Sequence, residues 1–133
     1  MEYQHSGLTG DIIVAAMEVH KELGCGFQEV IYQRSLEAEF TIRRMSFSRE
    51  IEIIVHYKNI DVGVRRVDFL VNNIISVELK AVTHLEDVHL AQALNYLEAY
   101  NLEVGLLLNL GAKRLEVKRL YNKRFNPYKI NEK

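Results

Sequence analysis

The spacing of apolar residues changes at Phe47, and this change limits the possible folds more than any other feature of the sequence. Before it, apolar residues recur every three or four positions over residues 9–23 and 28–44, which predicts two helices on either side of a turn at residues 24–26. After it, apolar residues occupy every second position over residues 51–55, as in a strand with one buried face. The sequence therefore predicts a pair of helices followed by a sheet.

The rest of the chain continues the strand pattern and interrupts it once with a helix. Two strands, residues 62–71 and 74–82, are joined through Asn72 and Asn73, which tolerate the left-handed backbone of a tight turn. A helix and two further strands are then expected at residues 86–100, 104–110 and 115–121. The order α-α-β-β-β-α-β-β predicts the α/β class, with a mixed sheet whose faces are covered by helices.

Composition and length fit one globular domain. The chain has 133 residues, 48% hydrophobic and 26% charged, so we expect one core over residues 1–133, with residues 1–7 and 126–133 loosely ordered. No apolar run approaches the roughly 20 residues that cross a bilayer, and the start of the chain lacks a signal-peptide pattern. Cys25 is the only cysteine and has no partner for an internal disulfide. These features lead us to expect a cytoplasmic protein.

The charge of the chain is nearly balanced overall but unevenly distributed. The net charge is −1, which by itself gives no sign of nucleic-acid binding. Residues 112–133 hold eight basic and two acidic residues, a net of +6, which leaves −7 for residues 1–111. A basic edge beside an acidic centre suits a protein that holds a phosphate backbone near a bound metal. A solvated edge strand protected by lysines is the alternative interpretation.

Three charged residues stand in two otherwise apolar strands. The two-residue period places Glu78 and Lys80 on one face of their strand, and Asp68 projects from the preceding strand. Buried charges need partners, so these residues could form an ion-pair cluster without chemistry. Alternatively, the two carboxylates supply oxygen ligands for Mg²⁺, and the lysine orients a water or stabilises charge on a phosphate.

Asp68, followed ten residues later by Glu78-Leu79-Lys80, resembles the signature of the PD-(D/E)xK nucleases, although Val67 stands where the motif has proline. Residues 26–32 read G-x-x-E-x-x-Y and resemble the motif of the GxxExxY protein family, a branch of that superfamily. The similarity continues through residues 66–71, 77–82, 92–97 and 105–109, and spans residues 8–121. It implies a restriction-endonuclease-like αβββαβ core with one extra N-terminal helix and a late strand.

The resemblance also implies roles for individual residues. The catalytic residues would be Asp68, Glu78, Lys80 and Glu29; the metal ligands, for Mg²⁺ or Mn²⁺, would be Asp68, Glu78, Glu29 and the backbone carbonyl of Leu79. For Glu29 the alternative is a helix-dipole preference, because it falls in the first turn of a predicted helix. The substrate-contacting residues would be Gln92, Tyr96, Tyr32 and Arg66, with Tyr32 mainly packed and its hydroxyl reaching the edge of the site.

The site depends on the connection between the two strands that carry it. If Asn72 and Asn73 formed a two-residue turn, Asp68 would pair with Val77 and face away from Glu78. A shared site needs the other pairing. We therefore predict a three- or five-residue connection, or a β-bulge, between Asp68 and Glu78.

These features predict a divalent-metal-dependent nuclease that hydrolyses phosphodiester bonds of nucleic acid, with DNA as the preferred substrate. The alternative is a catalytically inactive nucleic-acid-binding or assembly module that keeps the nuclease fold. A homodimer is compatible with either function, because a domain this small often needs a second copy to hold a duplex. No membrane partner is expected.

Overall fold

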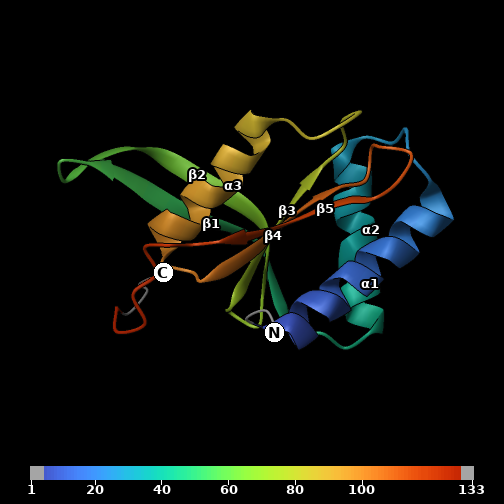
Figure 1. Ribbon diagram of the computed structural model, residues 1–133, viewed down its shortest axis with the longest axis horizontal. Helices are drawn as coiled ribbons and strands as arrows, with labels where there is room; N and C mark the ends of the chain where they lie inside the picture. The colour runs from blue at the N-terminus through green and yellow to red at the C-terminus, as the bar shows by residue number, and fades with distance from the viewer. Residues whose placement is uncertain (1–4, 130–133) are drawn as a thin grey trace.

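The computed structural model describes residues 5–129, which form three helices and one five-stranded sheet (Figure 1). In chain order the elements are α1 (Ser6–Leu23), α2 (Glu29–Ile42), β1 (Phe47–Tyr57), β2 (Ile60–Val71), β3 (Ile75–Lys80), α3 (Asp87–Tyr100), β4 (Val104–Asn109) and β5 (Glu116–Tyr121). The strands lie side by side in sequence order, and only β3 and β4 are parallel, with α3 as their crossover. The predicted α/β class, mixed sheet and element order are confirmed.

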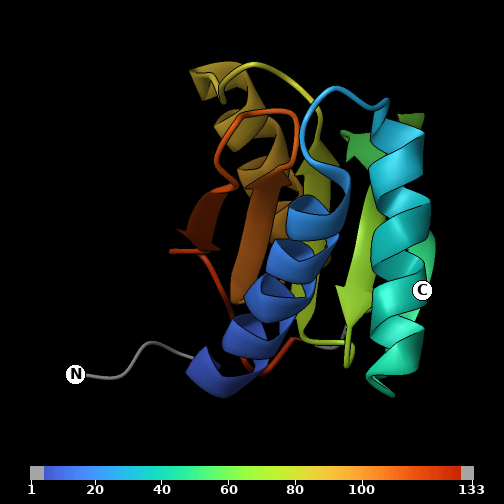
Figure 2. The same ribbon diagram turned by 90° about the vertical axis from the view of Figure 1, so that its right-hand side faces the viewer.

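The helices cover the two faces of the sheet unequally. Helices α1 and α2 lie together on one face, and α3 lies alone on the other (Figures 1 and 2). A large apolar cluster joins α1 and α2 to the sheet, with three phenylalanines (Phe40, Phe47 and Phe69) in mutual contact. A smaller cluster, which includes Val67, Leu70 and Leu97, fills the space under α3. We call these the two-helix face and the α3 face.

Strands β1 and β2 form a long hairpin whose two halves differ. The half that ends β2 is buried from Val67 to Val71 apart from Asp68, whereas the half near the turn is exposed. Figure 1 shows this exposed half projecting past α3. Its apolar side chains Ile54, Tyr57, Ile60 and Val64 are all at least half exposed. Only the buried half of the hairpin therefore contributes to the core.

The connection between β2 and β3 is the feature on which the site depends. Val71 pairs with Ile75, so three residues form the connection, and Asn72 and Asn73 have left-handed φ values of 53° and 58°. This register brings the position of Asp68 across from that of Glu78. The predicted odd-length connection is confirmed, and it removes Ile74 from the strand that the sequence assigned to it.

The ends of α1 and of the chain differ from the sequence prediction. Helix α1 begins at Ser6, three residues before the expected start, and Thr9 lies inside it, where its hydroxyl donates to the carbonyls of His5 and Ser6. Of the segments expected to be loosely ordered, residues 6–7 are helical, and Asn126 exchanges two hydrogen bonds with Asn101. The parts of that prediction at residues 1–4 and 130–133 lie outside the described residues.

Candidate active site

The charged residues gather at one end of the sheet, where β3 and β4 end and α2 begins. Asp68 comes from β2, Glu78 and Lys80 from β3, and Glu29 from the first turn of α2. The charges of Asp68 and Lys80 act on both Glu29 and Glu78, so the four groups form one electrostatic cluster. The fold thus places all four residues that the sequence assigned to catalysis at the same end of the sheet.

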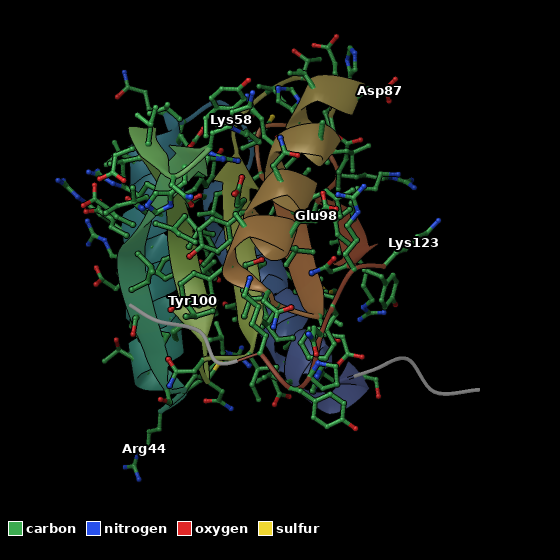
Figure 3. All side chains as sticks on the ribbon, turned by 90° about the vertical axis from the view of Figure 1, so that its left-hand side faces the viewer. Arg44, Lys58, Asp87, Glu98, Tyr100 and Lys123 are labelled. Atoms are coloured by element: carbon green, nitrogen blue, oxygen red, sulfur yellow. The ribbon has the colours of Figure 1, made fainter. Side chains whose placement is uncertain are left out.

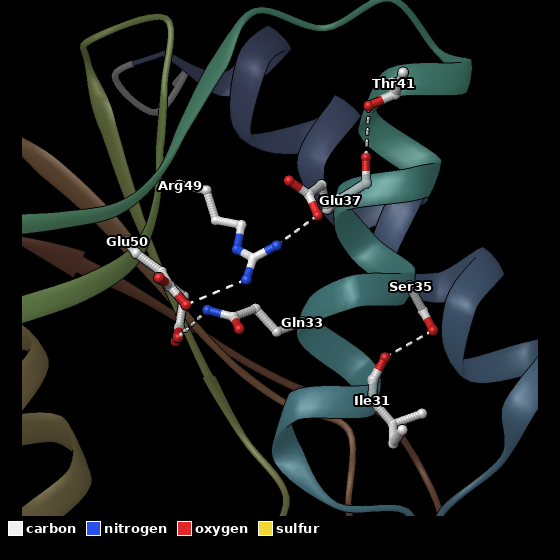
Figure 4. A network of polar contacts seen from close by, with 8 residues as sticks. Ile31, Gln33, Ser35, Glu37, Thr41, Arg49 and Glu50 are labelled. Carbon is white, nitrogen blue, oxygen red and sulfur yellow. Dashed lines mark hydrogen bonds and ion pairs between the residues drawn. The ribbon is translucent and has the colours of Figure 1, made fainter.

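Asp68 is held by one donor from the sheet and one from α2. Its Oδ2 accepts from the backbone N–H of Leu79 at 2.8 Å, and its Oδ1 accepts from Gln33 Nε2 at 3.0 Å. Gln33 extends from α2 toward the sheet for this contact (Figure 4). Burial raises the pKa of Asp68, whereas the Leu79 N–H and the Lys80 charge act in the opposite direction. The carboxylate is therefore fixed in place but poorly hydrated.

Glu78 is held from the other face of the sheet. Its Oε1 accepts from Arg65 Nη2 at 3.2 Å, and the same nitrogen donates to the backbone carbonyl of Gln92 in α3 at 2.6 Å. Only 5% of Glu78 is exposed, and this burial raises its pKa; Arg65 lowers the pKa, and the nearby Asp68 charge raises it further. Arg65 thus connects the carboxylate to the helix that covers this face.

A backbone irregularity explains why the two carboxylates are held from opposite faces. Glu50 in β1 has a left-handed φ of 54°, and the β1–β2 ladder has no pair between Glu50 and Asp68. Val67 packs in the α3 cluster, but Phe69, two residues later, packs in the two-helix cluster. The two-residue alternation is therefore broken at Asp68, which turns toward α2 while Glu78 stays on the α3 face.

Glu29 and Lys80 complete the cluster from its open side. Glu29 is exposed by surface area, yet enough protein surrounds it for partial loss of hydration to raise its pKa, and the charge of Asp68 raises it further. Lys80 is half-buried and lowers the pKa of Glu29, Asp68 and Glu78. This coupling to Asp68 distinguishes Glu29 from a glutamate placed only by the helix dipole.

Sequence comparison assigns the arrangement to a known superfamily. A family model of the PD-(D/E)XK nuclease superfamily matches residues 6–120. The chain belongs to the PD-(D/E)XK nuclease superfamily. Its fold is similar to the crystal structure of SSO0001, with a TM-score of 0.55 and 19% sequence identity over 71% of this chain and 50% of that one. The chain thus spans about half the length of that protein, and the likeness concerns the fold alone.

A search of curated proteins finds no significant match to the chain. Within residues 5–129, no helix combines the length and the apolar character needed to cross a membrane.

The acidic groups of this superfamily member fit a hard divalent cation by their chemistry. Asp68, Glu78 and Glu29 all have raised pKa values, so a cation placed among them would relieve the cost of keeping them charged. Members of the PD-(D/E)XK superfamily typically use divalent metals. Among residues 5–129, no three Asp, Glu, His or Cys side chains already stand together as a metal cage.

A second polar network, which the sequence analysis missed, fixes the chain after Lys80. Asn109 is fully buried at the end of β4, and its Oδ1 accepts from the N–H groups of Val82 and Gly111, both at 3.0 Å. Its Nδ2 donates to Glu116 Oε1 at 2.7 Å. Gly111 also lies so close to Val82 that a Cβ there would overlap its backbone. The sequence signal for this network is Asn109 itself, a polar residue at the end of an otherwise apolar strand.

Two of the residues expected to contact the substrate, both tyrosines, are buried. Tyr32 is fully buried, and its hydroxyl donates to the carbonyl of Gly24 at 2.6 Å and accepts from the N–H of Phe27 at 3.2 Å, so it holds the α1–α2 loop. Tyr96 is also fully buried, within the α3 cluster. Neither tyrosine is exposed in this structure, so a role of either in holding the substrate stays a prediction.

The two neighbouring arginines of β2 have different partners, and substrate contact by Arg66 stays a prediction. Arg66 is exposed and pairs with Glu52 at 2.9 Å, whereas Arg65 reaches Glu78. Gln92, the remaining residue of the expected set, is half-buried, and its backbone carbonyl rather than its side chain is the group bound to Arg65.

Proposed function

We propose that this protein is a divalent-metal-dependent nuclease of the GxxExxY branch that hydrolyses phosphodiester bonds of nucleic acid, with DNA as its preferred substrate. The observation that carries the proposal is the position of Asp68 and Glu78 at the same end of the sheet, near enough for the Asp68 charge to act on Glu78, with Lys80 acting on both. Placing two poorly hydrated acids near each other costs stability, so this arrangement favours a functional site over an ion-pair cluster that serves only stability.

In this proposal Asp68, Glu78 and the backbone carbonyl of Leu79 hold Mg²⁺ or Mn²⁺, and Glu29 completes the ligand set. When bound, the cation would lower the pKa of a coordinated water and polarise the phosphate. Gln33 and the Leu79 N–H keep the Asp68 carboxylate oriented. The Lys80 ammonium orients the attacking water and stabilises negative charge on the scissile phosphate. Positioning and electrostatics therefore carry most of the rate enhancement.

Cleavage of single- and double-stranded DNA with and without Mg²⁺ or Mn²⁺ tests the proposal. Asp68→Ala and Lys80→Ala should each lower the rate by on the order of 10²-fold or more. Asp61→Ala is the matched control, because Asp61 is an exposed aspartate on the same strand that pairs with His56. Cleavage that persists unchanged in both site variants would identify a contaminant and overturn the assignment.

One observation favours the second candidate function, an inactive nucleic-acid-binding or assembly module. Glu78 is already paired with Arg65, and the described residues contain no preformed metal cage. Calorimetric titration with Mg²⁺ and Mn²⁺ separates the two functions, since heat of binding that disappears in Asp68→Ala supports the nuclease. The expected homodimer also remains a prediction, which light scattering at several protein concentrations would test.

A further inference from the structure

A groove with a basic rim lies between α1 and the start of β5. Its volume is about 440 Å³. Its lining combines four apolar side chains with three basic side chains and a histidine: Ile13, Met17, Leu115, Val117, Lys21, Lys113, Arg114 and His20. No acidic residue lines it. A groove with this lining attracts an anionic ligand that also has an apolar part.

The groove lies at the same end of the sheet as the carboxylates. Lys80 pairs with Asn109 in the parallel ladder, and the β4–β5 connection leaves the sheet at that point. This connection passes against the backbone that follows Lys80, and the carbonyl of Ala112 contacts His20 Nε2 at 2.9 Å. Figure 2 shows the β4–β5 connection, the end of α1 and the connection leaving β3 together at this end.

The cations of the groove are available to a ligand. Within residues 5–129, Lys21, Lys113 and Arg114 make no ion pair, whereas Arg65 and Arg66 are each paired with a glutamate. Only one of the two basic dipeptides that flank β5 lies in the groove. Lys113-Arg114 precedes β5 and lies in the groove, whereas Lys123-Arg124 follows β5 at the far end of the sheet, because β5 is antiparallel to β4.

We propose that this groove holds the phosphates of one nucleic-acid strand that continues from the catalytic carboxylates. The proposal rests on the proposed nuclease function. The carboxylate cluster repels phosphate, so a strand entering it needs cations beside it, and Lys113 and Arg114 are unpaired cations on the connection that runs from it. A cleft of this size accepts a group of nucleotide size rather than a duplex. Met17 and Leu115 provide an apolar floor for sugar and base.

Two dipeptides of the same composition allow a matched test. Lys113→Gln/Arg114→Gln removes two of the three groove cations, and Lys123→Gln/Arg124→Gln removes the same charge at the far end. All four residues are exposed. Figure 3 shows Lys123 near Glu98, away from Asp87 at the start of α3, and Arg124 pairs with Glu98 at 3.5 Å. Each double variant loses two positive charges, so any effect of net charge alone will be equal in the two.

The measurement is the affinity for a fluorescein-labelled single-stranded 20-mer DNA, by anisotropy in EDTA from about 25 to 200 mM salt, which spans the range where phosphate contacts dominate affinity. Loss of two phosphate contacts should lower the slope of log K against log[salt] by about 1.4 and the affinity at 0.1 M salt by about 25-fold. The matched variant should keep the wild-type slope. Met17→Glu, at an exposed position of the floor, should also weaken binding.

The outcomes separate this proposal from the nuclease assignment, because binding in EDTA needs no cleavage. Selective loss of binding in the groove variants supports the groove even if no cleavage is found, in which case the nuclease assignment alone fails. Equal losses in the two dipeptide variants, or no binding by the wild-type protein, would overturn the groove proposal. Unchanged affinity in Lys113→Gln/Arg114→Gln would overturn it as well and leave an acidic protein segment as the ligand to test.

Discussion

The two faces of the sheet are built differently. The two-helix face buries sixteen hydrophobic residues in one cluster, whereas the α3 face buries six. The α3 face also contains the buried Glu78 with its Arg65 partner, and two buried tyrosine hydroxyls, those of Tyr96 and Tyr100, without a hydrogen-bond partner in the described chain. The larger face therefore supplies most of the folding free energy. The smaller face tolerates polar groups that would be costly in a well-packed core.

The same substitution on each face tests most directly whether the two faces contribute unequally to the free energy of unfolding. Leu36 in α2 and Leu97 in α3 are both fully buried leucines on helices. Leu36→Ala should lower the free energy of unfolding by about 4–5 kcal/mol, and Leu97→Ala by about 2–3 kcal/mol, because the thinner α3 layer can collapse into the cavity. Urea unfolding in EDTA measures both. Equal losses, or a larger loss for Leu97→Ala, would show that the two faces carry equal shares of stability.

Removing the partners of the two carboxylates should give the next largest loss of stability. Arg65→Met leaves the buried Glu78 without its cation and should cost about 2–3 kcal/mol, a value reduced because Arg65 is partly exposed. Gln33→Leu removes one of two donors to Asp68 and should cost about 1–2 kcal/mol. Urea unfolding without divalent metal is the measurement.

A metal titration of these two variants then sharpens the result. If the carboxylates bind a divalent cation, Mn²⁺ should restore part of the stability in both variants, since a cation bound only by the folded state stabilises it by mass action. Stability that Mn²⁺ leaves unchanged in the wild-type protein and in both variants would argue against a metal site.

The regular parts of the fold were predictable from local patterns. The change of period at Phe47 locates the passage from helices to sheet, and Asp68, Glu78 and Lys80 stand out because charges are rare in apolar strands. The odd-length connection was predicted from the two-residue period. The break in alternation at Asp68 was not, and it places Asp68 and Glu78 on opposite faces of the sheet.

The errors arise where tertiary contacts override these patterns. The left-handed backbone at Glu50 accompanies the break in the alternation of β2. Such a conformation is usually marked in a sequence by glycine or asparagine, and position 50 has neither. Arg65 therefore reaches Glu78 on the α3 face, a contact that no local pattern indicated. The burial of Tyr32 and Tyr96 was also hidden, since a motif names residue types but says nothing about what packs on them. The Asn109 network joins segments far apart in the chain, which spacing rules do not relate.

A pH titration should show a smaller effect of the same site. Burial raises the pKa of Asp68 above 3.8 and that of Glu78 above 4.5 in the folded protein. Lys80 and Glu50 are the charged groups acting on Asp68, and Arg65, Asp68 and Lys80 are those acting on Glu78. The folded state keeps these protons at pH values where the unfolded chain has lost them. The metal-free protein should therefore lose stability as the pH rises from about 4 through the raised pKa values, and then level off.

Urea midpoints in EDTA between about pH 4 and pH 8, which brackets this titration, provide the check. Glu78→Gln should flatten the fall because it removes one of the carboxyl groups whose pKa is raised, the others being Asp68 and Glu29. Glu52→Gln, at an exposed carboxylate in β1, should leave the curve unchanged. A fall of wild-type size in Glu78→Gln would show that Glu78 does not contribute to it.

The smallest effects compare a satisfied buried hydroxyl with an unsatisfied one. Tyr32→Phe, on the two-helix face, removes two hydrogen bonds and should cost about 1–2 kcal/mol. Tyr96→Phe removes a buried hydroxyl without a described partner and keeps the ring stacked on Tyr100, so it should change stability by about 0–1 kcal/mol, in the stabilising direction. A loss of stability in Tyr96→Phe as large as that in Tyr32→Phe would mean that an ordered water binds this hydroxyl. The polar groups of the α3 face would then be as well hydrogen-bonded as those of the two-helix face.

Unchanged stability with reduced DNA cleavage would instead assign the Tyr96 hydroxyl to the neighbouring site, where the charge of Glu78 already acts on it and helps to raise its pKa.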